Sequence, residues 1–297
     1  MPQTHHRVID VDGIPIFYRE AGDQDAPVVL LLHGAPSSSA MFRRLIPLLA
    51  DDYHVIAPDY PGFGNSATPG VNEFAYTFDH LADVIERFLE DLGVDRFAMY
   101  VQDYGAPVGW RLYLSDPARV TAIVSQSGNA YEEGFVDAFW APLWRHAASR
   151  REEDRQILLH SLDVESIRWQ YVHGLADPSV VDPDAWIRDA MQVNRPGNPD
   201  IQLALYDDYP CNRALYPDLQ ALFREDRVPL LAVWGRNDEI FGPDGARAFA
   251  RDLQDARIEL LDGGHWLLES HLHEVAEIMR GFLVTARRTV AARTLKA

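Results

Sequence analysis

The chain lacks several features that would place it in a specialised class. It has one cysteine, Cys211, which excludes an internal disulfide and, by itself, a thiolate metal cluster. No apolar run approaches the roughly 18 residues of a membrane-spanning helix, and the first seven residues lack the apolar stretch of a secretory signal. The formal charge of −18 disfavours nucleic acid and anionic membranes as partners. We therefore expect a cytoplasmic monomer or homodimer that binds a small molecule and uses no metal or cofactor.

Eight segments have the composition of β-strands. The first two flank Asp12-Gly13, a pair that favours a tight hairpin turn. Several others are continuous apolar runs, which is typical of strands buried on both faces of a parallel sheet. The predicted strands are Val8–Val11, Ile14–Arg19, Pro27–Leu32, Tyr53–Ala57, Phe97–Val101, Val120–Ser125, Val228–Trp234 and Arg257–Leu261.

Helical segments alternate with these strands, which predicts an α/β fold with a mainly parallel eight-stranded sheet and helices on both faces. From residue 131 to 216 no buried strand is evident, and the chain is rich in aromatic and charged residues. We expect residues 1–130 and 217–297 to form the core and 131–216 to form a helical cap over the carboxyl edge of the sheet. The basic stretch 287–296 is expected to extend the last helix or to fray. The helices predicted in the core are Met41–Leu49, Phe78–Leu92, Pro107–Leu114, Gly245–Leu253 and Val275–Val284.

One acidic residue, Asp103, stands directly after the fifth predicted strand, where a serine nucleophile is more usual. It is followed by Gly105 and a helix, and strand, turn and helix form the geometry of a nucleophile elbow. A carboxylate that attacks a saturated carbon leaves an ester, whose carbonyl can be attacked by an activated water. Asp103 therefore predicts a two-step displacement through a covalent intermediate. The alternative is that Asp103 only caps the following helix.

Two further residues follow later strands. Asp238 stands just beyond the seventh predicted strand and His265 just beyond the eighth. The order nucleophile, acid, histidine is typical of an α/β-hydrolase triad, in which His265 would activate water and Asp238 would orient the imidazole. The N–H groups of Ala35, in the turn after the third strand, and Tyr104 are expected to form an oxyanion hole. The alternatives are a turn role for Asp238, a structural role for His265 and a simple tight turn at Ala35.

The chain as a whole resembles the haloalkane dehalogenase and epoxide hydrolase group of α/β-hydrolases, which uses an aspartate nucleophile. The resemblance covers nearly the whole chain outside the cap, and implies the fold and the catalytic machinery rather than the substrate. The motifs that carry it are His33-Gly34-Ala35-Pro36, Asp59-Tyr60-Pro61-Gly62-Phe63-Gly64-Asn65-Ser66, Tyr76-Thr77-Phe78-Asp79, Gln102-Asp103-Tyr104-Gly105, Trp234-Gly235-Arg236-Asn237-Asp238 and Gly263-Gly264-His265.

Departures from the group's pattern bear on the leaving group. The resemblance implies a halide-binding tryptophan directly after the nucleophile in a dehalogenase, and in some an asparagine at the place of Ala35; here the first position is Tyr104. A cap tryptophan, among Trp140, Trp144 and Trp169, could donate instead. Fluoroacetate-type enzymes carry arginines soon after the nucleophile, where this chain has Tyr104 and Pro107, with Arg111 one helical turn later.

Epoxide hydrolases of similar pattern use cap tyrosines to protonate the leaving oxygen. Tyr209 is the best match for one of them by its spacing to Asn212, although a fluoroacetate-type enzyme has a tyrosine in a similar place. Tyr131 and Tyr171 are the candidates for a second. For each of these aromatic residues the alternative is packing between cap and core.

The resulting hypothesis is an epoxide hydrolase that acts without a cofactor through Asp103, His265 and Asp238, with Tyr209 as the donor to the leaving group. Haloalkane or haloacid dehalogenation is the alternative within the same chemistry. Carboxylesterase or lactonase action is a further one, although no Gly-x-Ser-x-Gly occurs and the nearest serines, Ser125 and Ser127, follow the next strand. The last alternative is a non-catalytic receptor that binds a ligand on the same scaffold. The residues expected around the substrate are His33, Trp140, Trp144, Trp169, Tyr206 and Trp266.

Overall fold

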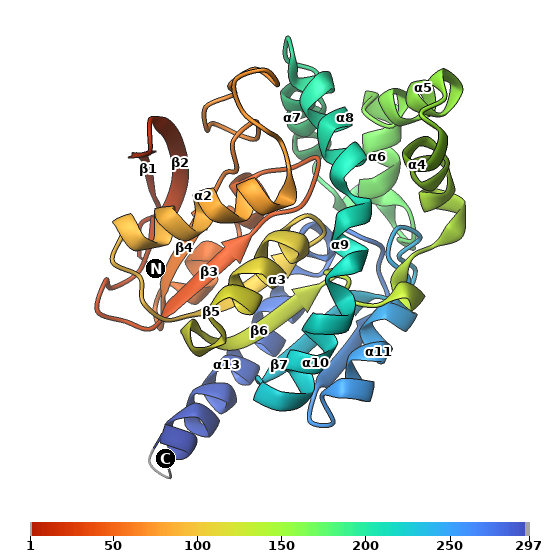
Figure 1. The fold of residues 1–297 in the computed structure, drawn as a ribbon. Coiled ribbons are helices and arrows are strands. Elements are labelled where there is room, and N and C mark those ends of the chain that lie inside the picture. Colours follow the sequence, from red (N-terminus) through yellow and green to blue (C-terminus); the bar gives the residue numbers. More distant parts are fainter. Residues whose placement is uncertain (1, 295–297) are drawn as a thin grey trace.

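A single eight-stranded sheet organises the computed structural model, which describes residues 2–294. The strands lie in the order β1-β2-β4-β3-β5-β6-β7-β8 (Figure 1). Strand β2 is antiparallel to both β1 and β4, and the remaining neighbours are parallel. The strands are β1 His5–Val11, β2 Ile14–Ala21, β3 Val28–Leu32, β4 His54–Pro58, β5 Phe97–Gln102, β6 Val120–Gln126, β7 Leu230–Gly235 and β8 Arg257–Leu261.

The local sequence explains both kinds of strand pairing. Asp12 and Gly13 join β1 to β2 with φ angles of 51° and 84°, the left-handed conformation that a two-residue hairpin turn requires. The central strands β4, β5 and β7 are buried along their whole length, as their continuous apolar runs predict. The predicted mainly parallel sheet of eight strands is confirmed.

Helices cover both faces of the sheet with separate apolar clusters. On one face lie α2 (Phe78–Asp91), α3 (Gly105–Ser115), α10 (Tyr216–Asp226) and α11 (Pro243–Asp252), which contribute Phe88, Trp110, Phe223 and Phe249. On the other face lie α1 (Ile46–Leu49), α12 (Leu267–Ser270) and α13 (Leu272–Thr294). The parallel strands thus bury both faces, and their carboxyl ends are left to form a site.

Two of the predicted core helices differ from the structure. The helix predicted over 41–49 is two short pieces, a 3₁₀ turn at Ser39–Phe42 and α1, because Pro47 lacks an N–H and fits only the first turn of a helix. Helix α13 begins three residues before the predicted start and reaches Thr294, so the described part of the basic stretch extends the helix. Residues 295–297 lie outside the described part of the chain.

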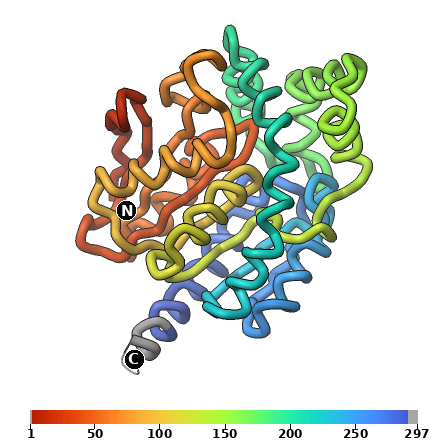
Figure 2. Tube along the Cα trace, viewed as in Figure 1, coloured from red at the N-terminus to blue at the C-terminus, as the bar shows by residue number. Residues whose placement is uncertain are grey.

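Between β6 and α10 the chain forms a run of helices, called here the inserted helices. Figure 2 shows this run, in green and teal, gathered on one side of the molecule, away from the hairpin β1–β2. The domain boundaries at residues 130 and 216 stay predictions. No helix within residues 2–294 combines the length and the hydropathy needed to cross a bilayer. The inserted helices are α4 Asp137–Ser149, α5 Glu152–His160, α6 Val164–Val172, α7 Pro183–Val193, α8 Asn198–Asp208 and α9 Pro210–Ala214.

Gly105 allows α3 to approach β3, and its replacement should destabilise the fold. A Cβ there would lie 2.1 Å from the carbonyl oxygen of Leu32, so Gly105→Ala forces helix and strand apart. We expect the free energy of unfolding in urea to fall by about 1–3 kcal/mol or more. Gly281→Ala is the matched control, because that glycine lies within α13 with nothing within 4 Å of its would-be Cβ, and it should gain up to about 1 kcal/mol. Equal effects of the two substitutions would contradict this account.

Candidate active site

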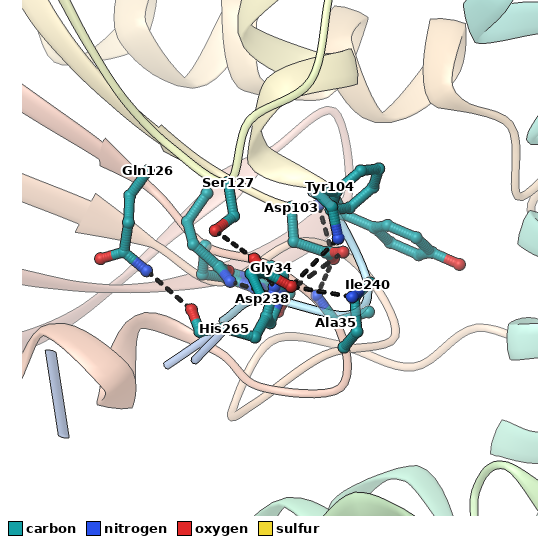
Figure 3. Close-up of polar contacts among 12 residues, drawn as sticks. Gly34, Ala35, Asp103, Tyr104, Gln126, Ser127, Asp238, Ile240 and His265 are labelled. Atoms are coloured by element: carbon teal, nitrogen blue, oxygen red, sulfur yellow. Dashed lines mark hydrogen bonds and ion pairs between the residues drawn. The ribbon is translucent and has the colours of Figure 1, made fainter. Parts of the chain in front are cut away.

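Asp103 lies at the carboxyl end of β5 in a conformation that few non-glycine residues adopt. Its φ angle is 49°, and its side chain is buried. The carboxylate oxygen Oδ1 accepts hydrogen bonds from the N–H groups of Ala35, at 2.8 Å, and Tyr104, at 2.6 Å (Figure 3). Helix α3 has Tyr104 at its cap position and no side-chain cap bond, so the Asp103 carboxylate is not serving as an ordinary helix cap.

His265 and Asp238 lie beside this carboxylate. Nδ1 of His265 is 2.9 Å from Oδ2 of Asp238, and Nε2 is 3.9 Å from Oδ2 of Asp103. Asp238 is itself fixed, because its Oδ1 accepts from the N–H groups of Ile240 and Phe241. Three strand ends therefore bring the predicted acid, base and nucleophile together in one buried cluster.

The electrostatics of the cluster follow from burial and from its two carboxylates. Burial raises the pKa of Asp103, against the opposing effects of His265 and of the N–H groups of Ala35 and Tyr104. Burial lowers the pKa of His265, but the charge and hydrogen bond of Asp238, together with the charge of Asp103, outweigh it and leave that pKa raised. The imidazole is thus a stronger base than an isolated histidine.

A cavity of about 480 Å³ opens onto this cluster. Asp103, Ala35 and Tyr104 line it from the core, and the inserted helices supply most of the remaining wall. Among the described residues no Lys or Arg lines the cavity, and the residues around it are largely apolar and aromatic. The polar side chains contributed by the inserted helices include Ser161, Gln202 and Tyr206. The cavity therefore suits a small neutral molecule better than an anion.

Tyr206, in α8, and Tyr209, directly after α8, have different surroundings. Tyr206 lines the cavity, and its hydroxyl lies 3.1 Å from Oγ of Ser161. Tyr209, the predicted donor, is buried among aromatic rings, with Trp140 at 4.6 Å and Phe78 at 5.6 Å between ring centroids, and it does not line the cavity. The role of Tyr209 as a leaving-group donor stays a prediction, and of the two tyrosines it is Tyr206 that lines the cavity.

The candidates for a second donor tyrosine and for a carboxylate-binding arginine form hydrogen bonds away from the cavity. The hydroxyl of Tyr131 donates to Asp252 and that of Tyr171 to Asp189. Arg111 pairs with Asp79 and donates to Asn212. None of these three lines the cavity.

The tryptophans expected around a leaving group are only partly placed for it. The indole N–H of Trp140 donates to the carbonyl oxygen of Ile240 at 2.8 Å, so this cavity residue has no free donor. Trp169 lines the cavity and is 36% exposed, whereas Trp144 and Trp266 do not line it. His33 also lies outside, where its ring is tilted against that of Tyr60 and its Nδ1–H donates to the carbonyl oxygen of Gly34.

Three residues join the site without having been given a role from the sequence. The hydroxyl of Ser127 donates to Oδ2 of Asp238 at 2.7 Å, the amide of Gln102 lies 2.8 Å from Nε2 of His265, and Ser161 contacts Tyr206. Gln102 adjoins Asp103 in the chain, and that adjacency was a usable signal; Ser161 had none. Within residues 2–294 no group of three or more His, Cys, Asp or Glu side chains is arranged to hold a metal ion.

Comparison with known proteins agrees with this fold. The family described as the alpha/beta hydrolase fold matches residues 27–272. An uncharacterized hydrolase of Saccharomyces cerevisiae is 44% identical over 275 residues, which cover 92% of this chain and 94% of that protein. This chain belongs to the alpha/beta hydrolase fold family and is a hydrolase.

More distant relatives carry the names of several activities, among them these two. A haloalkane dehalogenase of Bradyrhizobium diazoefficiens is 27% identical, over 91% of each chain. Epoxide hydrolase A of Mycobacterium tuberculosis is 39% identical over 122 residues, which are 41% of this chain and 38% of that one. The crystal structure of a protein named DBJA superimposes with a TM-score of 0.79 at 25% identity, over 96% of this chain and 98% of that one.

Proposed function

We propose that this hydrolase opens a small, neutral epoxide through an alkyl ester on Asp103. The observation that carries the proposal is that Asp103 and Tyr206 line the same cavity, Asp103 from the core and Tyr206 from the inserted helices. A carboxylate supplies the nucleophile for a strained ring carbon, and a phenol supplies the proton that the departing oxygen needs. The partial match to an epoxide hydrolase supports the same chemistry.

In the first step the geometry selects one oxygen of Asp103. Oδ1 already accepts two backbone hydrogen bonds, so Oδ2 attacks the ring carbon and the carbon–oxygen bond breaks. The electron pair stays on the departing oxygen, which takes the hydroxyl proton of Tyr206. Burial is the main cause that raises the pKa of Tyr206, the charge of Asp103 adds to it, and the hydrogen bond with Ser161 opposes it. Tyr206 therefore remains protonated at neutral pH and is able to donate.

In the second step His265 activates water against the ester. Oδ1 has become the ester carbonyl oxygen, and the N–H groups of Ala35 and Tyr104 stay in place to stabilise negative charge on it. Water attacks Cγ of Asp103 and gives a proton to Nε2 of His265. Asp238 stabilises the imidazolium through Nδ1. The intermediate then expels the alkoxide, which takes the proton from Nε2 and leaves as the diol. The carboxylic acid left on Asp103 gives up its proton and the phenolate of Tyr206 takes one up, so both groups return to their starting states.

Carbon–halogen cleavage is the second candidate, because it needs the same nucleophile, base and acid. The similarity to a haloalkane dehalogenase over 91% of each chain favours it. Trp169 also lines the cavity, and its indole N–H, unlike that of Trp140, has no hydrogen-bond partner among the described residues. Against it, Tyr104 follows Asp103, and its ring packs edge-on against Phe78. Haloacids fit less well still, since Arg111 is held by Asp79 and lies outside the cavity wall.

Replacing the general base should trap the first intermediate. His265→Gln keeps Asp103 ionised but removes the base for ester hydrolysis, so a stoichiometric adduct on Asp103 is expected with a reactive epoxide. Intact-mass measurement and peptide mapping would detect it. Asp103→Asn is the matched control and should give no adduct. Short haloalkanes assayed beside the epoxides distinguish the two leaving groups. Adducts and turnover with haloalkanes but not with epoxides would overturn the epoxide assignment.

The two neighbouring tyrosines should differ in their effect on ring opening. Tyr206→Phe removes the proposed proton donor and should lower kcat/KM for an epoxide by about 10²-fold or more. Tyr209→Phe removes a hydroxyl that does not line the cavity and should leave kcat/KM near that of the wild type. Steady-state diol formation measures both. A loss in Tyr209→Phe with full activity in Tyr206→Phe would reverse the assignment.

A further inference from the structure

Gln102 is fully buried beside the proposed general base and has no part in the steps described above. Its side-chain amide nitrogen lies 2.8 Å from Nε2 of His265, the atom that must receive a proton from water. Its Oε1 is buried and has no hydrogen-bond partner. Gly34 makes room for this arrangement, because a Cβ at that position would lie 2.0 Å from Oε1.

The hydrogen-bond roles around the ring favour one protonation state of His265. The carboxylate of Asp238 only accepts, so Nδ1 carries a hydrogen. In the neutral imidazole Nε2 is then an acceptor, and the amide N–H of Gln102 can donate to it. In the imidazolium Nε2 carries a hydrogen of its own, and this contact becomes a clash of two donors. The amide therefore stabilises the neutral ring.

Two carboxylates have the opposite effect and favour the protonated form of His265. Asp238 faces Nδ1 at 2.9 Å and Asp103 faces Nε2 at 3.9 Å, and both favour the imidazolium. A protonated Nε2 would form an ion pair with Asp103 and reduce the nucleophilicity of its carboxylate. It would also have no lone pair with which to take a proton from water. The first step thus needs a group that opposes both charges. In the second step, where Asp103 is an uncharged ester, the charge of Asp238 remains to be opposed.

We propose that Gln102 is a positioning residue that favours the neutral form of His265 and fixes its ring until a water takes the place of the amide at Nε2. The proposal rests on the proposed function for its consequence in catalysis. Because Oε1 has no partner, the carboxamide is held at its polar end by the histidine contact alone. A water that competes for Nε2 can displace it without breaking a second hydrogen bond. No covalent bond to Gln102 forms or breaks in this role.

The titration of His265 in the free protein tests this role without any substrate. Gln102→Met removes the donor and keeps the length of the side chain, so the pKa of His265 should rise by about half a unit to one unit, the equivalent of one neutral hydrogen bond. The measurement is NMR titration of histidine-labelled protein, with His265→Gln to assign the signal. Gln102→Leu provides a second donor-free variant, and a cooperative urea transition shows that each variant is folded.

Gln126→Met is the matched control. This second buried glutamine donates to the backbone oxygen of His265 and not to its ring, so the pKa of His265 should stay at the wild-type value. In Gln102→Met, the acid limb of kcat should move to higher pH by the same shift as the titration, because hydrolysis of the ester needs neutral His265. An unchanged or lower pKa in both folded Gln102 variants would overturn the proposal. If the shift occurs but no adduct forms on Asp103, only the proposed function fails.

Discussion

Two backbone N–H groups converge on one oxygen of Asp103, and this interaction holds a charged group inside a buried site. The donors come from distant segments, the turn after β3 and the start of α3, so the carboxylate links two loops of the sheet edge. A buried carboxylate without such partners would take up a proton, and it could then not act as the nucleophile of the proposed reaction. The left-handed backbone of Asp103 is what lets its side chain meet both donors.

The parallel sheet and the inserted helices contribute different groups to the site around this oxygen. The sheet edge supplies the carboxylate, the imidazole and Asp238, each at the end of a different strand. The inserted helices supply the apolar wall and the hydroxyl of Tyr206. In the proposed reaction the core therefore supplies the groups that act at the carbon, and the inserted helices supply those that meet the leaving group. Relatives of this chain carry the names of different activities, and a shared fold does not by itself fix the reaction.

Sequence patterns were sufficient for the sheet because each strand is a short apolar run between turn residues, as the hairpin at Asp12-Gly13 shows. The position of Asp103, Asp238 and His265 at strand ends followed from the same patterns. The sequence did not predict which of Tyr206 and Tyr209 lines the cavity. The two residues are three positions apart, and the exact rotation of the helix decides which one faces the cavity and which one packs among aromatic rings. Nor could spacing reveal that Trp140 uses its N–H on Ile240, because that contact joins residues 100 apart.

Oxygen transfer from water tests the central claim, that Asp103 carries the intermediate and is hydrolysed at its own carbonyl. A single turnover of an epoxide in ¹⁸O-labelled water, with enzyme in excess, should place the label in the Asp103 carboxylate and leave the diol unlabelled. Mass spectrometry of the peptide that contains Asp103, and of the diol, measures both. Label in the first-turnover diol, with an unlabelled Asp103, would mean direct attack of water on the substrate and would contradict the account.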